Sequence, residues 1–332
     1  MPNILITGAS GFIGSFLVET ALQKGYTTFA GVRNSSSKAY LNHANLYLLE
    51  LDFSNQLVLE NQLSTCAKEY GRFDFVVHVA GLTKSIFPQA YFDVNLGNTQ
   101  RFVQALINTG LTPNKFIFIS SLASYGPGVV GGAPITIAQK QAPVTAYGKS
   151  KLAAEQFLQQ TPDFPFVILH PTTVYGPREK DLLVLIKSIN QGIELFIGNK
   201  QQQLSFIHVA DVCKAVFLSI DVPIVNTALL LSDTMNYAAT EFNGMVKNIL
   251  AKKTIQLIVP VTLARICAKI ADQIGKLKGS TPIFNSERLN EFEANNWAVD
   301  ASPLKALGFV PDYPLQQGLI HTIDWYKQQG WL

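Results

Sequence analysis

The sequence predicts an α/β protein with a doubly wound parallel sheet in its N-terminal half and a smaller C-terminal lobe. Short apolar runs alternate with stretches of helical length and spacing through the first half, which is the pattern of βαβ units. Continuous apolar runs such as Phe75–Val77 are typical of parallel strands buried on both faces. The 332 residues exceed the size at which one core usually stops growing, so a second lobe is expected.

The alternation places each expected element. Strands are predicted at Asn3–Thr7, Thr27–Val32, Leu46–Leu51, Phe73–Val79, Lys115–Ser120 and Phe166–His170. Helices are predicted at Phe12–Lys24, Asn55–Tyr70, Tyr91–Thr109, Tyr147–Gln160 and Leu315–Gln329. The segment Ser205–Leu218 predicts a short strand followed by a helix. The first domain then covers residues 1–172 with a returning segment at about 205–232, and the second lobe covers 173–204 and 233–332.

Composition and charge exclude several classes of protein. Apolar residues make up 48% of the chain and charged residues 15%, which predicts a large core under an ordinary soluble surface. The net charge of +3 is spread without long runs, so no nucleic-acid or anionic-membrane footprint is expected. Cys66, Cys213 and Cys267 lie far apart, with no metal-ligand spacing, which predicts no metal site and fits a reducing cytoplasm.

No membrane span is expected either. Met1 is followed at once by the first strand, without the charged and apolar regions of a signal peptide. The apolar segment Ile255–Ile274 is interrupted by Pro260, Arg265 and Lys269, so it predicts an amphipathic or buried helix instead of a span.

A glycine-rich turn joins the first strand to the first helix. Gly8, Gly11 and Gly14 form a GxxGxxG pattern, which on its own also occurs in plain strand-to-helix connections. Its position at the end of the first strand points backbone N–H groups and a helix N-terminus at a pyrophosphate. Gly8 permits the tight turn, Gly11 the close approach of the diphosphate, and Gly14 the packing of helix on sheet. A Rossmann-type dinucleotide site is predicted, with further contacts from Ser10, Phe12 and Ile13.

Tyr147 and Lys151 form the one Tyr-x-x-x-Lys pair in the chain. On a helix the two side chains face one way, so the ammonium is expected to lower the pKa of the phenol and to hold the nicotinamide ribose. Such a phenol can pass a proton to or from a substrate oxygen while a hydride moves at the neighbouring carbon.

These motifs resemble the extended short-chain dehydrogenases/reductases, which include the NAD(P)-dependent epimerases and dehydratases. Thr7–Gly14 is similar to the TGxxGFIG signature of that family, and Ser121–Gly126 to its SxxxYG segment. The resemblance implies an oxidoreductase in which Ser121 donates a hydrogen bond to the substrate oxygen, with Ser120 and Ser124 as alternatives. Val77–Gly81, Asp93–Thr99 and His170–Arg178 fit the same family. The resemblance adds as cofactor contacts Asp52, Phe53, Ala80, Gly81, Thr83, Asn95, Ser120, Pro171, Thr173 and Val174.

The cofactor is predicted to be NADP(H), with NAD as the alternative. In the family an acidic residue after the second strand commonly selects NAD, whereas a basic residue accommodates the 2′-phosphate of NADP. This chain has Arg33 there, with Ser35 and Lys38 beside it. An exposed loop is the competing interpretation for these three residues, as a helix N-cap is for Asp52 or Ser54.

The substrate is expected to be a carbonyl compound or the matching secondary alcohol. Sugar-nucleotide relatives usually place an arginine two residues before the Phe206–Val209 segment, where it binds pyrophosphate, and this chain has Leu204. Arg178 or Lys200 could supply that charge instead. Val261–Ala271 predicts a helix that covers the cleft or packs in the core.

Two alternative functions stay open, a nucleotide-sugar 4-epimerase with tightly bound NAD and a non-catalytic NADP-binding regulator. The resemblance also implies a homodimer through Tyr91–Thr109 and Tyr147–Gln160.

Overall fold

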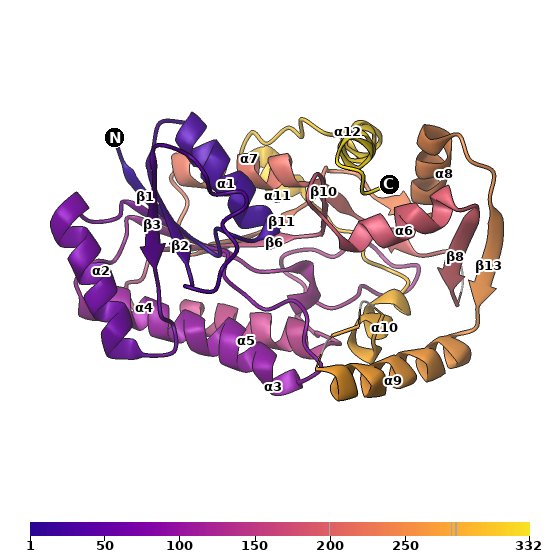
Figure 1. The fold of residues 1–332 in the computed structure, drawn as a ribbon, viewed down its shortest axis with the longest axis horizontal. Coiled ribbons are helices and arrows are strands. Elements are labelled where there is room, and N and C mark those ends of the chain that lie inside the picture. The colour runs from indigo at the N-terminus through magenta and orange to yellow at the C-terminus, as the bar shows by residue number, and fades with distance from the viewer. Residues whose placement is uncertain (199, 280, 283) are drawn as a thin grey trace.

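A seven-stranded parallel sheet forms the centre of the first domain (Figure 1). The computed structural model describes residues 1–198, 200–279, 281–282 and 284–332. The strand order is β11-β6-β5-β4-β1-β2-β3, so the chain starts in the middle of the sheet and winds outward in both directions. The strands are β1 (Asn3–Thr7), β2 (Thr27–Val32), β3 (Leu46–Glu50), β4 (Phe75–His78), β5 (Lys115–Ile119), β6 (Phe166–Pro171) and β11 (Thr227–Leu231).

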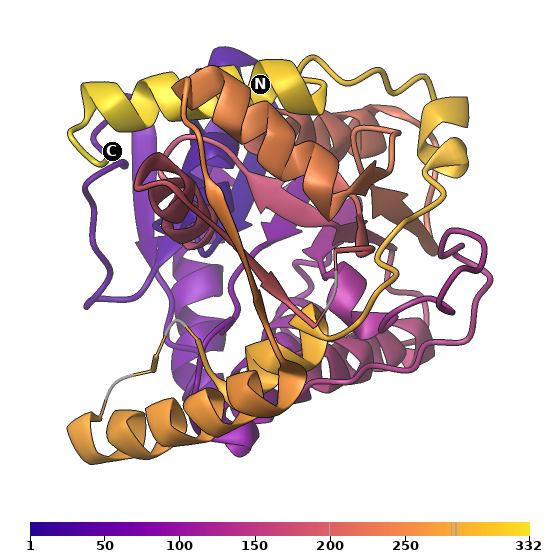
Figure 2. The same ribbon diagram turned by 90° about the vertical axis from the view of Figure 1, so that its right-hand side faces the viewer.

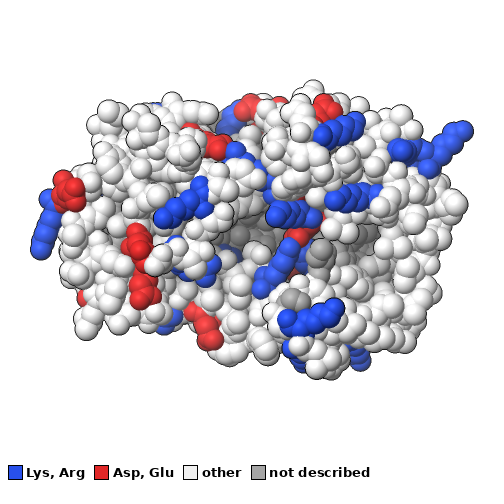
Figure 3. All heavy atoms as spheres, in the orientation of Figure 1, with Lys and Arg blue, Asp and Glu red and all other residues white. Residues whose placement is uncertain are grey.

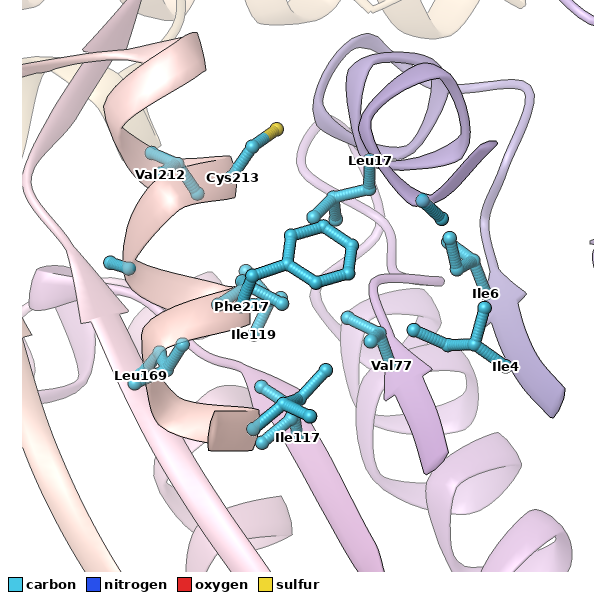
Figure 4. Close-up of a cluster of buried hydrophobic side chains, with 14 of the residues drawn as sticks. Ile4, Ile6, Leu17, Val77, Ile117, Ile119, Leu169, Val212, Cys213 and Phe217 are labelled. Atoms are coloured by element: carbon cyan, nitrogen blue, oxygen red, sulfur yellow. The ribbon is translucent and has the colours of Figure 1, made fainter. Parts of the chain in front are cut away.

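Helices cover both faces of this sheet. On one face α1 (Phe12–Gln23) and α7 (Val209–Asp221) pack over the strands, and Figure 4 shows Phe217 of α7 and Leu17 of α1 meeting side chains of the sheet. The other face is covered by α2 (Gln56–Tyr70), α4 (Asn98–Asn108) and α5 (Ala146–Gln160), as Figure 1 shows. Two apolar layers therefore fix the carboxyl ends of the strands in place.

The second lobe is built from helices and three short strand pairs around a core of its own that includes Tyr175, Phe206, Phe242 and Tyr326. The strand pairs are β7 (Thr173–Tyr175) with β10 (Phe206–His208), β9 (Gln203–Leu204) with β12 (Tyr237–Ala238), and β8 (Ile193–Ile197) with β13 (Ile255–Val259). The helices of this lobe are α6 (Asp181–Asn190), α8 (Ala239–Leu250), α9 (Val261–Lys278), α10 (Ser286–Phe292) and α12 (Leu315–Gln328). Helix α11 (Ser302–Ala306) instead packs on β11 of the main sheet.

The predicted strands and helices of the first half are confirmed, with ends that shift by a residue or two. One helix differs in kind. The predicted Tyr91–Thr109 helix is broken into α3 (Pro88–Tyr91), the π-helical turn η1 (Phe92–Gly97) and α4. The segment Ser205–Leu218 forms a strand and a helix as expected, but its strand β10 pairs with β7, and the strand that joins the main sheet is β11.

The expectation of one amphipathic or buried helix over Ile255–Ile274 is wrong in its first part. Ile255–Val259 is strand β13, paired in parallel with β8, and α9 begins only after Pro260. Single-segment periodicity could not show this, because a short apolar run becomes a strand only where a partner strand is available. Among the described residues, no helix is long and apolar enough to cross a membrane.

Candidate active site

The glycine turn is held open at the start of α1. Gly8 has φ +67°, and a Cβ there would lie 2.7 Å from the Ala80 nitrogen, so only glycine fits beside the end of β4. The N–H of Gly11 donates to the Gly8 carbonyl at 3.0 Å and closes the turn. No side chain in the described part of the chain caps α1, which leaves first-turn N–H groups, with those of Phe12 and Ile13 among them, available to an anion.

Gly14 allows a close approach between α1 and the end of β1. A Cβ on Gly14 would lie 2.1 Å from the carbonyl oxygen of Gly8, the residue that directly follows β1, so a side chain there would push the helix away from the strand end. The turn as a whole fits a dinucleotide diphosphate, because Gly11 is exposed at the start of α1 with no side chain over its backbone.

The residues expected at the adenosine end lie after β2 and β3. Arg33, Ser35 and Lys38 are exposed on the loop that follows β2, where a turn closes between Arg33 and Ser36 (N–O 2.9 Å). Asp52 follows β3 and accepts hydrogen bonds from the backbone (2.9 Å) and hydroxyl of Ser54. Neither Asp52 nor Ser54 caps α2, because Asn55 accepts from its first-turn N–H groups instead.

Ser121 and Tyr147 come together at the carboxyl end of β5. Ser121 is the second residue after that strand. Thr145 caps α5 by accepting from the N–H of Gly148 at 3.1 Å, which places Tyr147 in the first turn of the helix. The Ser121 side chain lies close enough to the Tyr147 hydroxyl to lower the pKa of that phenol. Burial has the larger effect and raises the pKa of Tyr147 to about 12.

Lys151 follows Tyr147 by one turn of α5 but does not act on the phenol as predicted. Its ammonium donates to the Ile119 carbonyl at 2.8 Å and lies 4.8 Å from the centre of the Phe118 ring. Burial lowers the pKa of Lys151 to about 8, although the charge of Glu155 opposes this. The expected lowering of the phenol pKa by Lys151 is therefore wrong, since desolvation is the largest influence on the phenol and raises its pKa.

A buried network behind Lys151 explains which serine faces Tyr147. Glu155, one turn further along α5, accepts a hydrogen bond from Ser120 and one from Gln141 at 2.6 Å, and its carboxylate lies 3.1 Å from His170. Burial alone would raise the pKa of Glu155, but His170 and these donors hold it below its usual value. The Ser120 side chain thus serves this network, and Ser124 donates to the Ser121 carbonyl at 2.9 Å, so Ser121 is left beside Tyr147.

Asn95 joins the loop that follows β4 to helix α5. From the π-helical turn its side chain accepts from the Leu82 N–H at 2.7 Å and donates to the Ser150 hydroxyl at 2.9 Å. A Cβ on Gly81 would lie 3.1 Å from the Asn95 oxygen and 3.4 Å from the Lys151 ammonium nitrogen. Gly81 is therefore close to Lys151, as one continuous cofactor site requires.

The other predicted contacts lie around this centre. Ser10 is half-buried in the glycine turn and Thr83 is exposed after β4, whereas Phe53 turns its ring toward His78 and Phe102 in the core. Pro171 is buried at the end of β6, and on β7 Thr173 is exposed and Val174 half-buried. In the described ranges no group of three His, Cys, Asp or Glu residues could hold a metal.

Helix α10 contributes charged groups that no motif predicted. Glu287 accepts from the Ala146 N–H at 2.7 Å at the start of α5, and Glu291 lies 3.4 Å from the Thr145 hydroxyl. Burial raises the pKa of Glu291 to about 7, and its charge in turn raises that of Tyr147. These residues lie about 140 positions after Tyr147 in sequence, so only the fold brings them to it.

The substrate side lacks the arginine of sugar-nucleotide relatives. Leu204 is half-buried against the apolar core of the second lobe. Arg178 does not replace it, because its guanidinium donates to Ser15 (3.0 Å) and Glu19 (2.7 Å) on α1, while Lys200 is hydrogen-bonded to Gln256. Figure 3 shows this face of the molecule hollowed near its middle, with Lys and Arg side chains beside the hollow.

Comparisons with known proteins agree with this geometry. Residues 4–226 match the model of the NAD dependent epimerase/dehydratase family. A UDP-glucose 4-epimerase of Vibrio cholerae is 30% identical over 99% of this chain and 97% of its own, and a ceramide reductase of Caulobacter vibrioides is 24% identical over 99% and 96%. The crystal structure of a UDP-glucuronic acid 4-epimerase from Bacillus cereus in complex with NAD superposes with TM-score 0.77, 20% identity and coverage of 98% and 99%.

Proposed function

Because the chain belongs to the NAD-dependent epimerase/dehydratase family, we propose that it moves a hydride between a nicotinamide cofactor and a carbinol carbon, with Tyr147 as acid and base. The observation that carries this is the convergence of Ser121, Tyr147 and Lys151 at the carboxyl end of β5, where Ser121 lowers the pKa of the Tyr147 phenol and Lys151 donates to the Ile119 carbonyl. In doubly wound sheets ligands bind at that edge, where the strand order reverses.

Each side chain then has one task. The bound cofactor supplies or accepts the hydride. The first-turn N–H groups of α1 hold its diphosphate, and the Lys151 ammonium holds its ribose. Ser121 donates to the substrate oxygen, and Tyr147 exchanges a proton with that oxygen as the carbon changes between alcohol and carbonyl.

The relatives support a nucleotide-sugar 4-epimerase better than the ketone reduction expected from the sequence. The Vibrio cholerae relative matches along nearly its whole length, and it is a UDP-glucose 4-epimerase by name. In an epimerase the same hydride leaves the sugar carbon and returns to its opposite face, so NAD stays bound and nothing is consumed. We therefore take a sugar 4-epimerase as the first candidate.

Net reduction of a ketone with NADPH is the second candidate, and specific observations favour it. Leu204 cannot bind a diphosphate, Arg178 is engaged with α1, and Arg33 is exposed where a 2′-phosphate would bind. The ceramide reductase of Caulobacter vibrioides matches over a similar length, at lower identity.

One pair of assays separates the candidates. The purified protein is incubated with UDP-glucose without added cofactor, and the 4-epimer is sought by chromatography. In parallel, NADPH oxidation is followed with a set of long-chain ketones. Epimer formation that Tyr147→Phe abolishes supports the first candidate, and NADPH oxidation that the same variant abolishes supports the second. Bound nucleotide with neither reaction would favour the non-catalytic regulator and contradict the proposal.

A further inference from the structure

Helix α9 leaves an apolar stripe exposed on the second lobe. It packs next to α10 through small residues, since Ala264, Ala268 and Gly275 are buried. Its larger apolar side chains remain exposed, so the alternative that Val261–Ala271 packs in the core is wrong for them. At about 100° per residue they share one side of the helix over roughly 20 Å. Their exposed fractions are Leu263 49%, Ile266 56%, Ile270 55%, Ile274 46% and Leu277 88%.

The strand pair β8–β13 extends this surface. Ile193 is the register partner of Ile255, and Leu195 of Leu257, so all four side chains project from one face of the pair, where each is exposed. Pro260 joins β13 directly to α9, and Figures 1 and 2 show both at the same end of the molecule. We call the surface the apolar edge, defined by Ile193, Leu195, Ile255, Leu257, Leu263, Ile266, Ile270, Ile274 and Leu277.

Positive charge is concentrated in the segment that contains β13 and α9. Residues 252–278 hold six of the 26 basic residues and one of the 23 acidic ones. The acidic residue, Asp272, is turned to the protein, where it accepts from the Ser286 N–H at 3.4 Å, and Arg265 is paired with Glu293. The five lysines of this segment are exposed, namely Lys252, Lys253, Lys269, Lys276 and Lys278.

We propose that the apolar edge binds the surface of an anionic phospholipid bilayer, with the apolar side chains at the acyl boundary and the lysines among the headgroups. An exposed apolar stripe on a lysine-rich helix is the composition of segments that lie on a membrane without crossing it. A second copy of the chain is disfavoured as the occupant, because pairing two such surfaces would bring like charges together. The even charge distribution expected from the whole sequence conceals this local excess.

Binding by the apolar edge would place the active site beside the bilayer. Helix α9 packs on α10, and Glu287 of α10 is hydrogen-bonded to the first turn of α5, the turn that carries Tyr147. One helix thus separates the apolar edge from the reacting groups. The consequence that the substrate is carried on a lipid rests on the proposed function, whereas the binding itself does not.

Cys267 offers a direct probe, because it is exposed on α9 while Cys66 and Cys213 are buried. An environment-sensitive dye on Cys267 is mixed with vesicles of phosphatidylcholine alone or of phosphatidylcholine with phosphatidylglycerol. We expect a blue shift with the anionic vesicles that added salt weakens. Sedimentation of the unlabelled protein with the same vesicles checks that the dye does not create the binding.

Two variants test the apolar edge itself. Ile266→Asp with Ile270→Asp should weaken vesicle binding by roughly tenfold or more, because two charges replace apolar contacts at the acyl boundary. Leu57→Asp, at a 76% exposed position on α2, is the matched control and should bind like the unchanged protein. The unfolding temperature and cofactor binding should stay unchanged in both the Ile266→Asp with Ile270→Asp variant and the Leu57→Asp control. A failure of the proposed function would appear in the activity assays, whereas a failure of this proposal would appear only in vesicle binding.

The proposal would be overturned if the protein did not sediment with anionic vesicles, or if Leu57→Asp lost as much vesicle binding as Ile266→Asp with Ile270→Asp. It would also be overturned if the protein were a dimer in solution that Ile266→Asp with Ile270→Asp dissociates. The last result would assign the apolar edge to a second copy of the chain.

Discussion

The Lys151 ammonium donates a hydrogen bond at 2.8 Å to the carbonyl of Ile119, the last residue of strand β5. This bond holds the cation at the carboxyl edge of the sheet, over the Phe118 ring and close to Gly81. A buried lysine held in this way costs stability while it is charged, and it is positioned for a ligand that will use the charge.

Lys151→Met should therefore separate stability from activity. In the folded protein the pKa of Lys151 is lowered to about 8 from its ordinary value of 10.5, so the cost of the buried charge is fully present below pH 8 and disappears as the pH rises from 8 to 10.5. At pH 7 the variant should be more stable than the unchanged protein by about 1–2 kcal/mol, after the loss of the bond to Ile119. Chemical denaturation at pH 7 and pH 10 measures the difference, which should shrink at pH 10.

The turnover of Lys151→Met should fall by on the order of a hundredfold or more, because Lys151 is proposed to hold the cofactor. Lys149→Met, two residues earlier and exposed, is the control and should change neither quantity. A Lys151→Met variant that unfolds more easily at pH 7 would contradict the sign of the argument.

Tyr147→Phe should abolish proton exchange while leaving the fold intact. A general acid or base contributes about 10²–10⁴-fold, so kcat should fall by that order while cofactor binding persists. Absorbance titration without cofactor provides a second measurement. The tyrosine lost in the variant should ionise above pH 10, because burial raises the pKa of Tyr147 to about 12. An ordinary titration near pH 10 for this residue would show that the phenol is not desolvated.

Local patterns were enough to predict the N-terminal sheet, the glycine turn and the Tyr147–Lys151 pair, because each is a property of adjacent residues. They placed Ser121 after β5, close to Tyr147, and its bond to a substrate oxygen stays a prediction. They could not predict that burial would raise the pKa of the phenol, since desolvation depends on what the whole fold packs around it. The position of Glu291 beside α5 and the pairing of β8 with β13 could not be predicted for a related reason, because both depend on partners that are distant in sequence.

Glu291→Gln should remove a pH dependence from the stability of the protein. Burial raises the pKa of Glu291 from 4.5 to about 7, so the folded state favours its protonated form. Stability from this group is fully present below pH 4.5 and is lost as the pH rises through 7. The variant should match the unchanged protein at pH 4.5 and exceed it at pH 8 by on the order of 1–3 kcal/mol.

Denaturation curves at the two pH values measure this difference, and Glu293→Gln on the same segment is the comparison. The charge of Glu291 also raises the pKa of Tyr147, so the glutamine variant should let the phenol ionise at a lower pH. Equal gains in stability at pH 4.5 and pH 8 would mean that Glu291 is not protonated by burial.

Arg33→Ala tests the choice of cofactor. Arg33 is exposed directly after β2, beside the strand that leads into the glycine turn, and its side chain is free to meet the ribose of a nucleotide on α1. If Arg33 binds the 2′-phosphate of NADP, its removal should weaken the binding of NADPH by about 10–100-fold, which is the effect of one or two charge-assisted hydrogen bonds. The binding of NADH should not change. Fluorescence titration with both nucleotides measures the ratio, and Arg72→Ala, an exposed arginine before β4, is the matched control. An unchanged protein that binds NADH as tightly as NADPH, with no effect of Arg33→Ala on either, would assign Arg33 to the solvent and NAD to the site, in agreement with the epimerase candidate.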